Sequence, residues 1–331
     1  MAVKTTLDRS GETTAPEVTP ILDADTARLL ARLGRTEDLR FSPNCRKLAL
    51  AGYAANSCLI LDIAIDCTAP APRIAITGAT EFSSGDMCEP HGFDFVDDQT
   101  LVVANRGGCV AVFDLPHSAA SPIRLAARHR ITRASWTRRL HSPGSVLVSG
   151  VDDAGFELLV CNNYRNRVTQ HRIALGGGQR NRILLQRGLK VPDGITQTPD
   201  SRWLAVSNHF TASVQIYDRT KPLNHRSASH GQLTGTGFPH GLCFSPDGRH
   251  AFVADAGAPL VHVFHAPDGQ WQGDHAPARS VRVLSEQVFR RERTNEAEGG
   301  PKGLDIDATG RILAVTCEEQ PLAFFAIADL I

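Results

Sequence analysis

Short runs of alternating apolar and polar residues, separated by Pro, Gly and Asp, recur along most of the chain. The clearest example spans residues 238–265, where a Pro-His-Gly turn precedes apolar runs at 242–245, 250–254 and 260–265. A Pro-Asp-Gly turn separates the first two runs, and a loop that opens with Asp255 separates the last two. Alternation bounded by turn residues predicts antiparallel strands joined as hairpins.

Six versions of this unit occur in the sequence. The first apolar residue of each opening run gives the anchors of the repeat: Leu39, Phe93, Val146, Ile195, Leu242 and Leu304. The steps between anchors are 54, 53, 49, 47 and 62 residues. A period near 50 with three clear strands and a weaker fourth is typical of a β-propeller blade. The fourth strands are predicted at 73–77, 122–126, 182–186, 231–235 and 280–284.

The repeat predicts an all-β protein, a six-bladed β-propeller with four-stranded antiparallel blades around a central channel. We expect one propeller domain over residues 18–331, preceded by a disordered polar tail at residues 1–17. The last unit has only three strands, so the segment before Glu37 is expected to complete it and remove two exposed sheet edges. Residues 21–33 predict a short helix capped by Asp23 or Asp25. A seventh, degenerate blade within 115–142 or 265–300 is the structural alternative.

Composition narrows the class of protein. Apolar residues make up 42% of the chain, the formal net charge is zero and the pI is about 7.2. This balance predicts no nucleic-acid partner, which would need a basic stripe. The sequence has no apolar signal-peptide core and no apolar run of about 18 residues, so we expect no membrane segment. Eight Cys without a CxxC pair predict free thiols in a cytoplasmic protein.

The repeat also predicts where polar side chains gather. In a propeller the first strand of each blade lines the axis, so residues two positions before the anchors meet at one channel mouth. These residues are Glu37, His91, Gly144, Asp193, His240 and Lys302. The loops after the second strands open on the same mouth and begin at Asn105, Asn162, Asn208, Asp255 and Cys317, while Glu89 and Glu298 lie just upstream of two Pro-x-Gly turns.

Such a group suits a metal site or acid–base catalysis. The alternative is structural, because polar residues beside glycine also cap strand ends and form turns. The sequence contains no G-x-S-x-G elbow, no P-loop and no dinucleotide-binding glycine fingerprint.

Pro-x-Gly before the first strand, Phe-Ser-Pro-Asp-Gly between strands, and the strand endings VAD, VSN and VAN carry a family resemblance. Over about residues 37–327 the chain resembles NHL-type and YVTN-type β-propellers and the wider group of gluconolactonase-like and strictosidine-synthase-like proteins. The resemblance implies a small-molecule enzyme, a lactonase-like hydrolase or a lyase, that works at the channel mouth. It is specific for the fold and weak for the activity, because this group also contains interaction scaffolds.

The resemblance also implies a divalent metal, with Ca, Zn or Fe left open. Gluconolactonase-like proteins hold a cation with a Glu and with Asn and Asp from other blades, and Glu37 and Asp193 occupy similar positions. His240 departs from that pattern, since calcium prefers oxygen ligands. Amidating-lyase propellers bind zinc through several His-Gly turns, to which His91-Gly92 and His240-Gly241 are similar. Two His and a carboxylate suit zinc or iron.

We therefore predict three sets of site residues. The metal ligands are Glu37, Asp193 and His240, and the catalytic residues that handle charge or protons are His91 and Lys302. The predicted ligand-binding residues are Glu89, Asn105, Asn162, Asn208 and Asp255. The partner is a small-molecule substrate that the sequence does not name. The competing hypothesis is a non-catalytic scaffold that binds a ligand or a protein.

Overall fold

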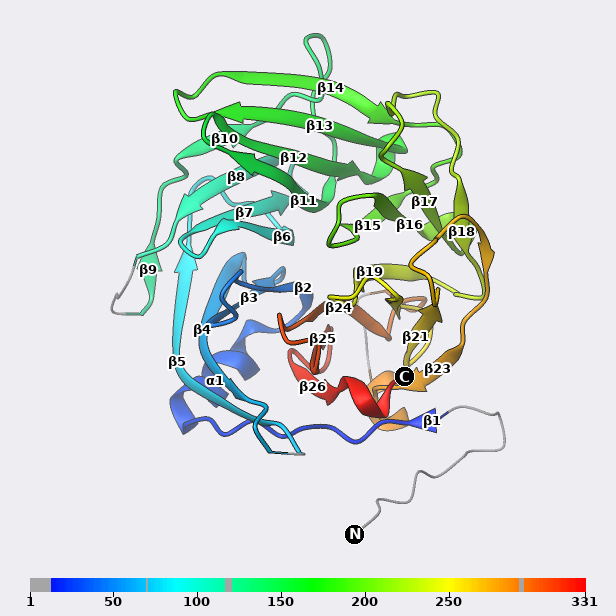
Figure 1. Cartoon of the computed structure of the whole chain (residues 1–331). Helices are drawn as coiled ribbons and strands as arrows, with labels where there is room; N and C mark the ends of the chain where they lie inside the picture. The colour runs from blue at the N-terminus through cyan, green and yellow to red at the C-terminus, as the bar shows by residue number, and fades with distance from the viewer. Residues whose placement is uncertain (1–12, 70, 117–120, 292–294) are drawn as a thin grey trace.

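The computed structural model describes residues 13–69, 71–116, 121–291 and 295–331. Six small sheets stand around a central axis (Figure 1), and their innermost strands contact one another in the ring order β2, β6, β11, β15, β19, β24 and back to β2. The predicted six-bladed β-propeller is therefore confirmed, and the described parts of the two candidate segments form no seventh blade.

The blades follow one another along the chain. Blade one contains β2 (Thr36–Phe41), β3 (Lys47–Gly52), β4 (Ser57–Asp66) and β5 (Arg73–Ser83), with β9 (Ile123–Arg124) at its outer edge. Blade two contains β6 (Pro90–Asp97), β7 (Thr100–Asn105), β8 (Cys109–Asp114) and β10 (His129–Ile131). Blade three contains β11 (Pro143–Asp152), β12 (Gly155–Asn162), β13 (Arg167–Ala174) and β14 (Gln179–Leu185).

The second half of the ring repeats this order. Blade four contains β15 (Pro192–Gln197), β16 (Trp203–Asn208), β17 (Ser213–Asp218), β18 (Gly231–Leu233) and an added β22 (Gly273–His275). Blade five contains β19 (Pro239–Phe244), β20 (His250–Asp255), β21 (Leu260–His265), β23 (Arg279–Arg282) and an added β1 (Thr13–Thr14). Blade six contains β24 (Pro301–Ile306), β25 (Ile312–Cys317) and β26 (Ala323–Ala326). The helices are α1 (Ala24–Leu33) and α2 (Glu286–Phe289), and 3-10 turns span Asn163–Arg165, His209–Thr211 and Ile327–Asp329.

The core lies between blades. Between blades two and three, for example, Val102 and Val112 pack in one apolar cluster with Leu158 and Val160. Five further clusters fill the remaining gaps between neighbouring blades in the same way. A blade is thus apolar on both faces, which explains why its middle strands read as nearly continuous apolar runs.

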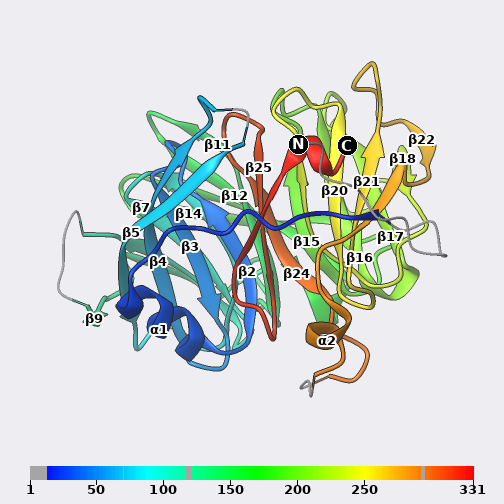
Figure 2. The same ribbon diagram turned by 90° about the horizontal axis from the view of Figure 1, so that it is seen from below.

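The segment before Glu37 closes the ring. Glu17 forms an antiparallel bridge with Phe325 of β26, and the Val18 amide donates to the Phe324 carbonyl at 2.7 Å. The same segment pairs with blade five through β1 and with blade one through a bridge between Ile21 and Ala75, and it crosses all three outer edges in Figure 2. The N-terminal segment therefore meets blade six through a single bridge rather than through the full strand that the sequence predicts.

The expected disordered tail falls partly outside the structure. Residues 1–12 are not among the described residues, whereas Thr13–Thr14 form β1 and Glu17 forms its bridge to β26. The predicted helix is present as α1, and Asp23 caps it by accepting a hydrogen bond from the Thr26 amide at 2.7 Å.

One predicted outer strand is wrong. The segment 122–126 was expected to complete blade two, but Ile123–Arg124 adds as β9 to blade one, parallel to β5. The fourth strand of blade two is instead β10, which pairs with β8 and buries Ile131 completely. The apolar pattern of 122–126 does not distinguish these edges, because either edge accepts a short strand.

The cysteines and the helices can be compared with the expectations of free thiols and of no membrane segment. All eight cysteines lie within the described residues and none forms a disulfide. Among the helices of the described residues, none has the length and apolar character needed to cross a membrane.

A buried histidine in blade three should give the protein a defined acid sensitivity. The His171 side chain donates from Nδ1 to Asn181 Oδ1 at 2.9 Å and accepts at Nε2 from the Thr169 hydroxyl at 2.8 Å. Burial lowers the pKa of His171 to about 4, although the Asn181 hydrogen bond opposes this shift. Unfolding therefore takes up a proton below pH about 6.5, so stability is lost as the pH falls from there to about 4.

We expect His171→Gln to remove this loss. The wild-type free energy of unfolding, relative to that of the variant, should fall by about 3 kcal/mol between pH 7 and pH 4. Urea titrations of both proteins at pH 7, 5.5 and 4 measure the difference. A difference that does not change with pH would show that His171 titrates normally.

Candidate metal centre at the channel mouth

The Pro-x-Gly turns aim their central residues at the axis. In blades three to six the strand register shifts between the Pro and the anchor, as between Pro192 and Ile195 or Pro239 and Leu242. Such a bulge bends the inner strand and redirects the intervening side chain. The glycine that follows lets neighbouring inner strands approach, because a Cβ on Gly241 would lie 2.5 Å from the Lys302 carbonyl oxygen.

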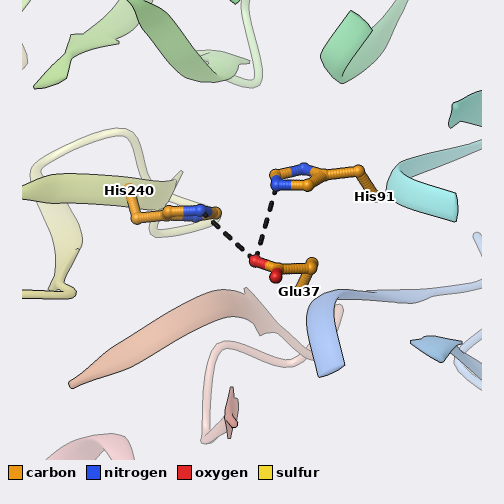
Figure 3. A group of neighbouring side chains, drawn as sticks. All are labelled: Glu37, His91 and His240. Carbon is orange, nitrogen blue, oxygen red and sulfur yellow. Dashed lines mark ion pairs between the residues drawn. The ribbon is translucent and has the colours of Figure 1, made fainter. Parts of the chain in front are cut away.

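Glu37, His91 and His240 converge from three blades (Figure 3). One ligand atom of each lies within 4.8 Å of the others, and all three residues are buried. Glu37 Oε2 is 3.4 Å from His91 Nε2 and 3.7 Å from His240 Nε2. Ligands of a tetrahedral metal at usual zinc distances stand about 3.4 Å apart. Two of the three donor separations are thus close to ligand spacing, and the group could hold a divalent metal of this kind.

The His91 ring is held as metal-ligating histidines usually are. His91 Nδ1 donates to the Gly144 carbonyl at 2.8 Å, which makes Nε2, 3.4 Å from Glu37 Oε2, the ring nitrogen without a proton. The His91 and His240 rings stack with centroids 5.4 Å apart and an interplanar angle of 26°. A ring nitrogen fixed by a carbonyl is the common outer-shell device of histidine metal sites.

Electrostatics keep the centre in the protonation states that a metal needs. Burial would raise the pKa of Glu37, but Lys302, His91 and Arg35 lower it to about 2. Burial and the Arg106 guanidinium lower the pKa of His91 to about 3. Burial also lowers the pKa of His240, against the opposing charge of Asp193. At neutral pH Glu37 is therefore ionised and both imidazoles are neutral.

Asp193 and Lys302 complete the predicted ring. Asp193 Oδ2 is 3.2 Å from His240 Nε2, and its Oδ1 accepts from Asn163 Nδ2 at 2.7 Å. Lys302 Nζ donates to Glu37 Oε2 at 3.0 Å and to Glu298 Oε2 at 3.1 Å. Burial lowers and Glu37 raises the pKa of Lys302, and the net shift is upward. Lys302 is thus a protonated partner of Glu37 and is unsuited to act as a base.

Glycine at the third-blade position has a specific cause. A Cβ on Gly144 would lie 2.2 Å from Asn163 Oδ1 and 2.3 Å from Asp193 Oδ1. Only a residue without a side chain leaves room for the hydrogen bond between Asn163 and Asp193.

Five of the six ring positions predicted from the sequence therefore carry ionisable side chains that meet at the mouth, and the sixth makes room for them. Among the described residues, the group that could bind a metal contains the predicted ligands Glu37 and His240. Its third member is His91, and Asp193 lies beside it.

Arg106 borders the same centre. Its Nη2 lies 2.8 Å from His91 Nε2 and 3.5 Å from Asp193 Oδ2, and its Nη1 donates to Ser142 Oγ at 3.3 Å. The guanidinium therefore uses the lone pair that His91 would offer to a metal. A bound cation requires Arg106 to turn away from His91.

Because Arg106 and a metal compete for His91 Nε2, removal of the Arg106 side chain should strengthen metal binding. We expect Arg106→Gln to raise the affinity for Zn²⁺ by about tenfold, because the variant removes a positive charge and frees His91 Nε2. Competition titration against a chromophoric chelator measures the change. Arg128→Gln, which removes an exposed arginine paired with Asp114, is the control and should leave the affinity unchanged. A weaker affinity in Arg106→Gln would mean that Arg106 supports the centre.

A cavity of about 560 Å³ lies above the cluster of ionisable side chains around Glu37, His91 and His240. Arg35, Arg106 and Glu298 line it and contact cluster residues, while Tyr53, Tyr164 and Glu89 form other parts of its wall. The predicted ligand-binding residue Glu89 thus borders the cavity. Asn295 also lines this cavity, close to Glu298 in the sequence.

The other four predicted ligand-binding residues lie at the ends of the second strands and outside the ligand group. Asn105, Asn162 and Asn208 each accept a hydrogen bond from the amide two residues before a blade's opening proline, at Cys88, His141 and Lys190 respectively. Asp255 accepts from Gly237 and Phe238 in the same way and also contacts His262 Nε2 at 3.0 Å. These four side chains are buried and fix the loops that carry the Pro-x-Gly turns.

Several cluster residues escaped the sequence analysis. Arg106, Asn163 and His209 each come one residue after the Asn that ends a second strand, so the repeat contained a signal one position beyond the one used. His209 Nε2 lies 3.5 Å from Glu298 Oε1, and Arg35 donates to Glu37. Arg35 lies outside the positions that the repeat aligns, whereas Glu298 was noted in the sequence as lying just upstream of a Pro-x-Gly turn.

Comparison with known proteins adds a structural neighbour. No family model matches the sequence, and no curated protein matches it. Among solved structures, the chain is similar to a functionally unknown protein from Desulfotomaculum acetoxidans, with a TM-score of 0.53 and 16% sequence identity. The match covers 88% of this chain and 83% of that chain. At this identity the likeness shows the fold alone.

Proposed function

We propose that the channel mouth is a metal-dependent active site for a small molecule, with hydrolysis of a lactone or a lyase reaction as its chemistry. The observation that carries this proposal is the convergence of Glu37, His91 and His240 from three blades at near-ligand spacing. A bound divalent cation supplies a Lewis acid for the substrate carbonyl or an activated water. The eight free thiols support a reducing, cytoplasmic environment.

The chain's own residues have separate roles in this proposal. Lys302 and Arg35 hold Glu37 ionised, and the Gly144 carbonyl orients His91. Arg106, displaced from His91, faces the cavity and donates hydrogen bonds to a carbonyl or carboxylate oxygen of the substrate. The 560 Å³ cavity has the size of a small-molecule site.

A substrate panel tests the proposal. Purified protein would be assayed with lactones, esters and lyase substrates, before and after chelation and after Zn²⁺ or Fe²⁺ is returned. We expect chelator-sensitive turnover that His91→Ala with His240→Ala abolishes. The matched control is His250→Ala with His265→Ala, which removes another stacked pair with centroids 4.5 Å apart outside the cluster. Turnover that survives loss of His91 and His240 would refute the assignment of the site.

A non-catalytic binding scaffold is the second candidate, and one observation favours it. The carboxylates of Glu37, Asp193 and Glu298 contact the cations of Arg35, Arg106 and Lys302, so the cluster balances its charge without a metal. A scaffold would bind its ligand or protein partner with no metal in the protein. Equilibrium dialysis that finds no metal uptake in wild type or in Arg106→Gln would favour this candidate.

A further inference from the structure

A second pocket next to the channel mouth is lined by four arginines. This arginine pocket has a volume of about 320 Å³ and consists of Arg138, Arg139, Leu140, His141, Arg165 and Arg167. Arg165 ends the 3-10 turn Asn163–Arg165, and Arg167 begins β13. Arg138 and Arg139 come from the loop between β10 and β11, which folds back through a hydrogen bond from the Ala134 amide to the Arg138 carbonyl at 2.8 Å.

These arginines lack counter-ions within the part of the chain that the structure describes. Within the described residues, no carboxylate lies at ion-pair distance from Arg138, Arg139, Arg165 or Arg167. Arg167 is 4% exposed, and its Nη2 donates to the Arg139 carbonyl at 3.0 Å. Its Nε is buried and has no hydrogen-bond partner among the described residues. A buried guanidinium with an unpaired donor costs free energy unless a ligand supplies the acceptor.

The guanidinium groups also raise one another's energy. Burial and the nearby charges of Arg138 and Arg165 lower the pKa of Arg167, the opposite of the shift that an ion pair gives an arginine. Like charges held together in a partly buried pocket repel unless an anion enters.

The surrounding segment strengthens the local positive potential. Residues 121–190 contain thirteen Arg and Lys but only three Asp and Glu, a net charge of +10, although the whole chain is neutral. A field of this sign draws anions toward the pocket and raises their rate of association.

We propose that the arginine pocket is a binding site for a phosphate group. A phosphate dianion neutralises two positive charges and offers acceptor oxygens in several directions, which suits guanidinium donors arriving from two loops. A single carboxylate neutralises only one charge. This site does not depend on the proposed metal centre.

The pocket's position bears on the source of the phosphate. Leu140 and His141 line both the arginine pocket and the cavity above the metal cluster, and Tyr164 of that cavity precedes Arg165. The phosphate could therefore belong to a phosphorylated small molecule that extends toward the mouth, or it could be free inorganic phosphate. Both sources share the same phosphate chemistry.

Calorimetric titration of the full-length protein with inorganic phosphate tests the site. Arg138→Ala with Arg165→Ala changes two exposed side chains and should weaken phosphate binding at least tenfold. The matched control, Arg128→Ala with Arg172→Ala, removes two arginines of the same segment that are paired with Asp114 and Asp152 and should change binding less than twofold. Acetate should bind at least tenfold more weakly than phosphate. Absence of phosphate binding, or equal losses in the two double variants, would overturn the proposal.

A second titration with phenyl phosphate separates the two sources. Tighter binding of the ester than of phosphate, with the gain lost in Tyr164→Ala, supports a phosphorylated small molecule. Equal binding of both supports inorganic phosphate. Ester binding that Arg138→Ala with Arg165→Ala leaves unchanged would place the phosphate elsewhere and refute the site.

Discussion

Glu37→Gln is expected to lower the affinity for a divalent metal more than 100-fold. Among the described residues, Glu37 supplies the only carboxylate of the group that could bind a metal. Its Oε2 lies near Nε2 of both His91 and His240. An amide oxygen in its place carries no charge and binds zinc or iron weakly. Chelator competition with Zn²⁺ on the folded variant measures the loss.

Glu298→Gln is the matched control for this variant. Glu298 also contacts Lys302, at 3.1 Å, but lies outside the ligand group. We expect its metal affinity to stay within a few-fold of wild type. Thermal melts of both variants are needed, because each leaves the buried Lys302 with one carboxylate partner instead of two. Equal metal affinities in wild type and Glu37→Gln would exclude Glu37 as a ligand.

Arg40→Met should produce the largest loss of stability. Arg40 is largely buried in the channel, with Nη1 3.2 Å from Asp305 Oδ1 and Nε 3.9 Å from Asp94 Oδ1. These carboxylates and Asp38 join neighbouring blades by accepting from the amides of Phe41, Val148 and Phe93. Removing the cation leaves buried carboxylates unpaired, which costs about 3–5 kcal/mol of unfolding free energy.

The loss should depend on pH. Burial raises the pKa of Asp38 to about 7, although Arg40 opposes the shift. The folded state then holds a proton that the unfolded state releases above pH about 4, so this carboxyl's contribution to stability declines as the pH rises toward 7. Without Arg40 the pKa rises further, and the deficit of Arg40→Met should be larger at pH 8 than at pH 5.

Urea unfolding of wild type and Arg40→Met at pH 5 and pH 8 measures both effects. Arg46→Met, at an exposed arginine of the adjacent turn, should stay within about 0.5 kcal/mol of wild type at both values. A deficit below about 1 kcal/mol, the scale of an exposed ion pair, would show that Arg40 is not the charge that holds the carboxylates together.

The sequence repeat predicted both the blades and the ring of side chains at the mouth for one reason. The step of about 50 residues and the Pro-x-Gly bulge recur together, so residues such as His91 and His240 occupy equivalent places in rotated blades. Side chains outside the repeat could not be placed in this way. Arg35 lies outside the positions that the repeat aligns, and the repeat does not distinguish Asn105, which binds the loop, from Arg106, which contacts His91.

The net charge of the whole chain concealed a local excess of positive charge. A net charge of zero argued against a nucleic-acid partner and gave no sign of a local basic region, yet the segment 121–190 carries +10 and contains the residues of the arginine pocket. The outer strand of blade two was misplaced for a related reason, since a short apolar run does not reveal which sheet edge it joins.

The most direct test of the metal centre is the metal content of the purified full-length protein, measured by mass spectrometry after dialysis against Zn²⁺ or Fe²⁺ and removal of excess metal. Wild type should retain about one equivalent per chain, His91→Ala with His240→Ala should retain less than a tenth of that, and His250→Ala with His265→Ala should match wild type. A wild-type protein that retains no metal, or a His91 and His240 variant that retains a full equivalent, would contradict the assignment of Glu37, His91 and His240 as a metal site.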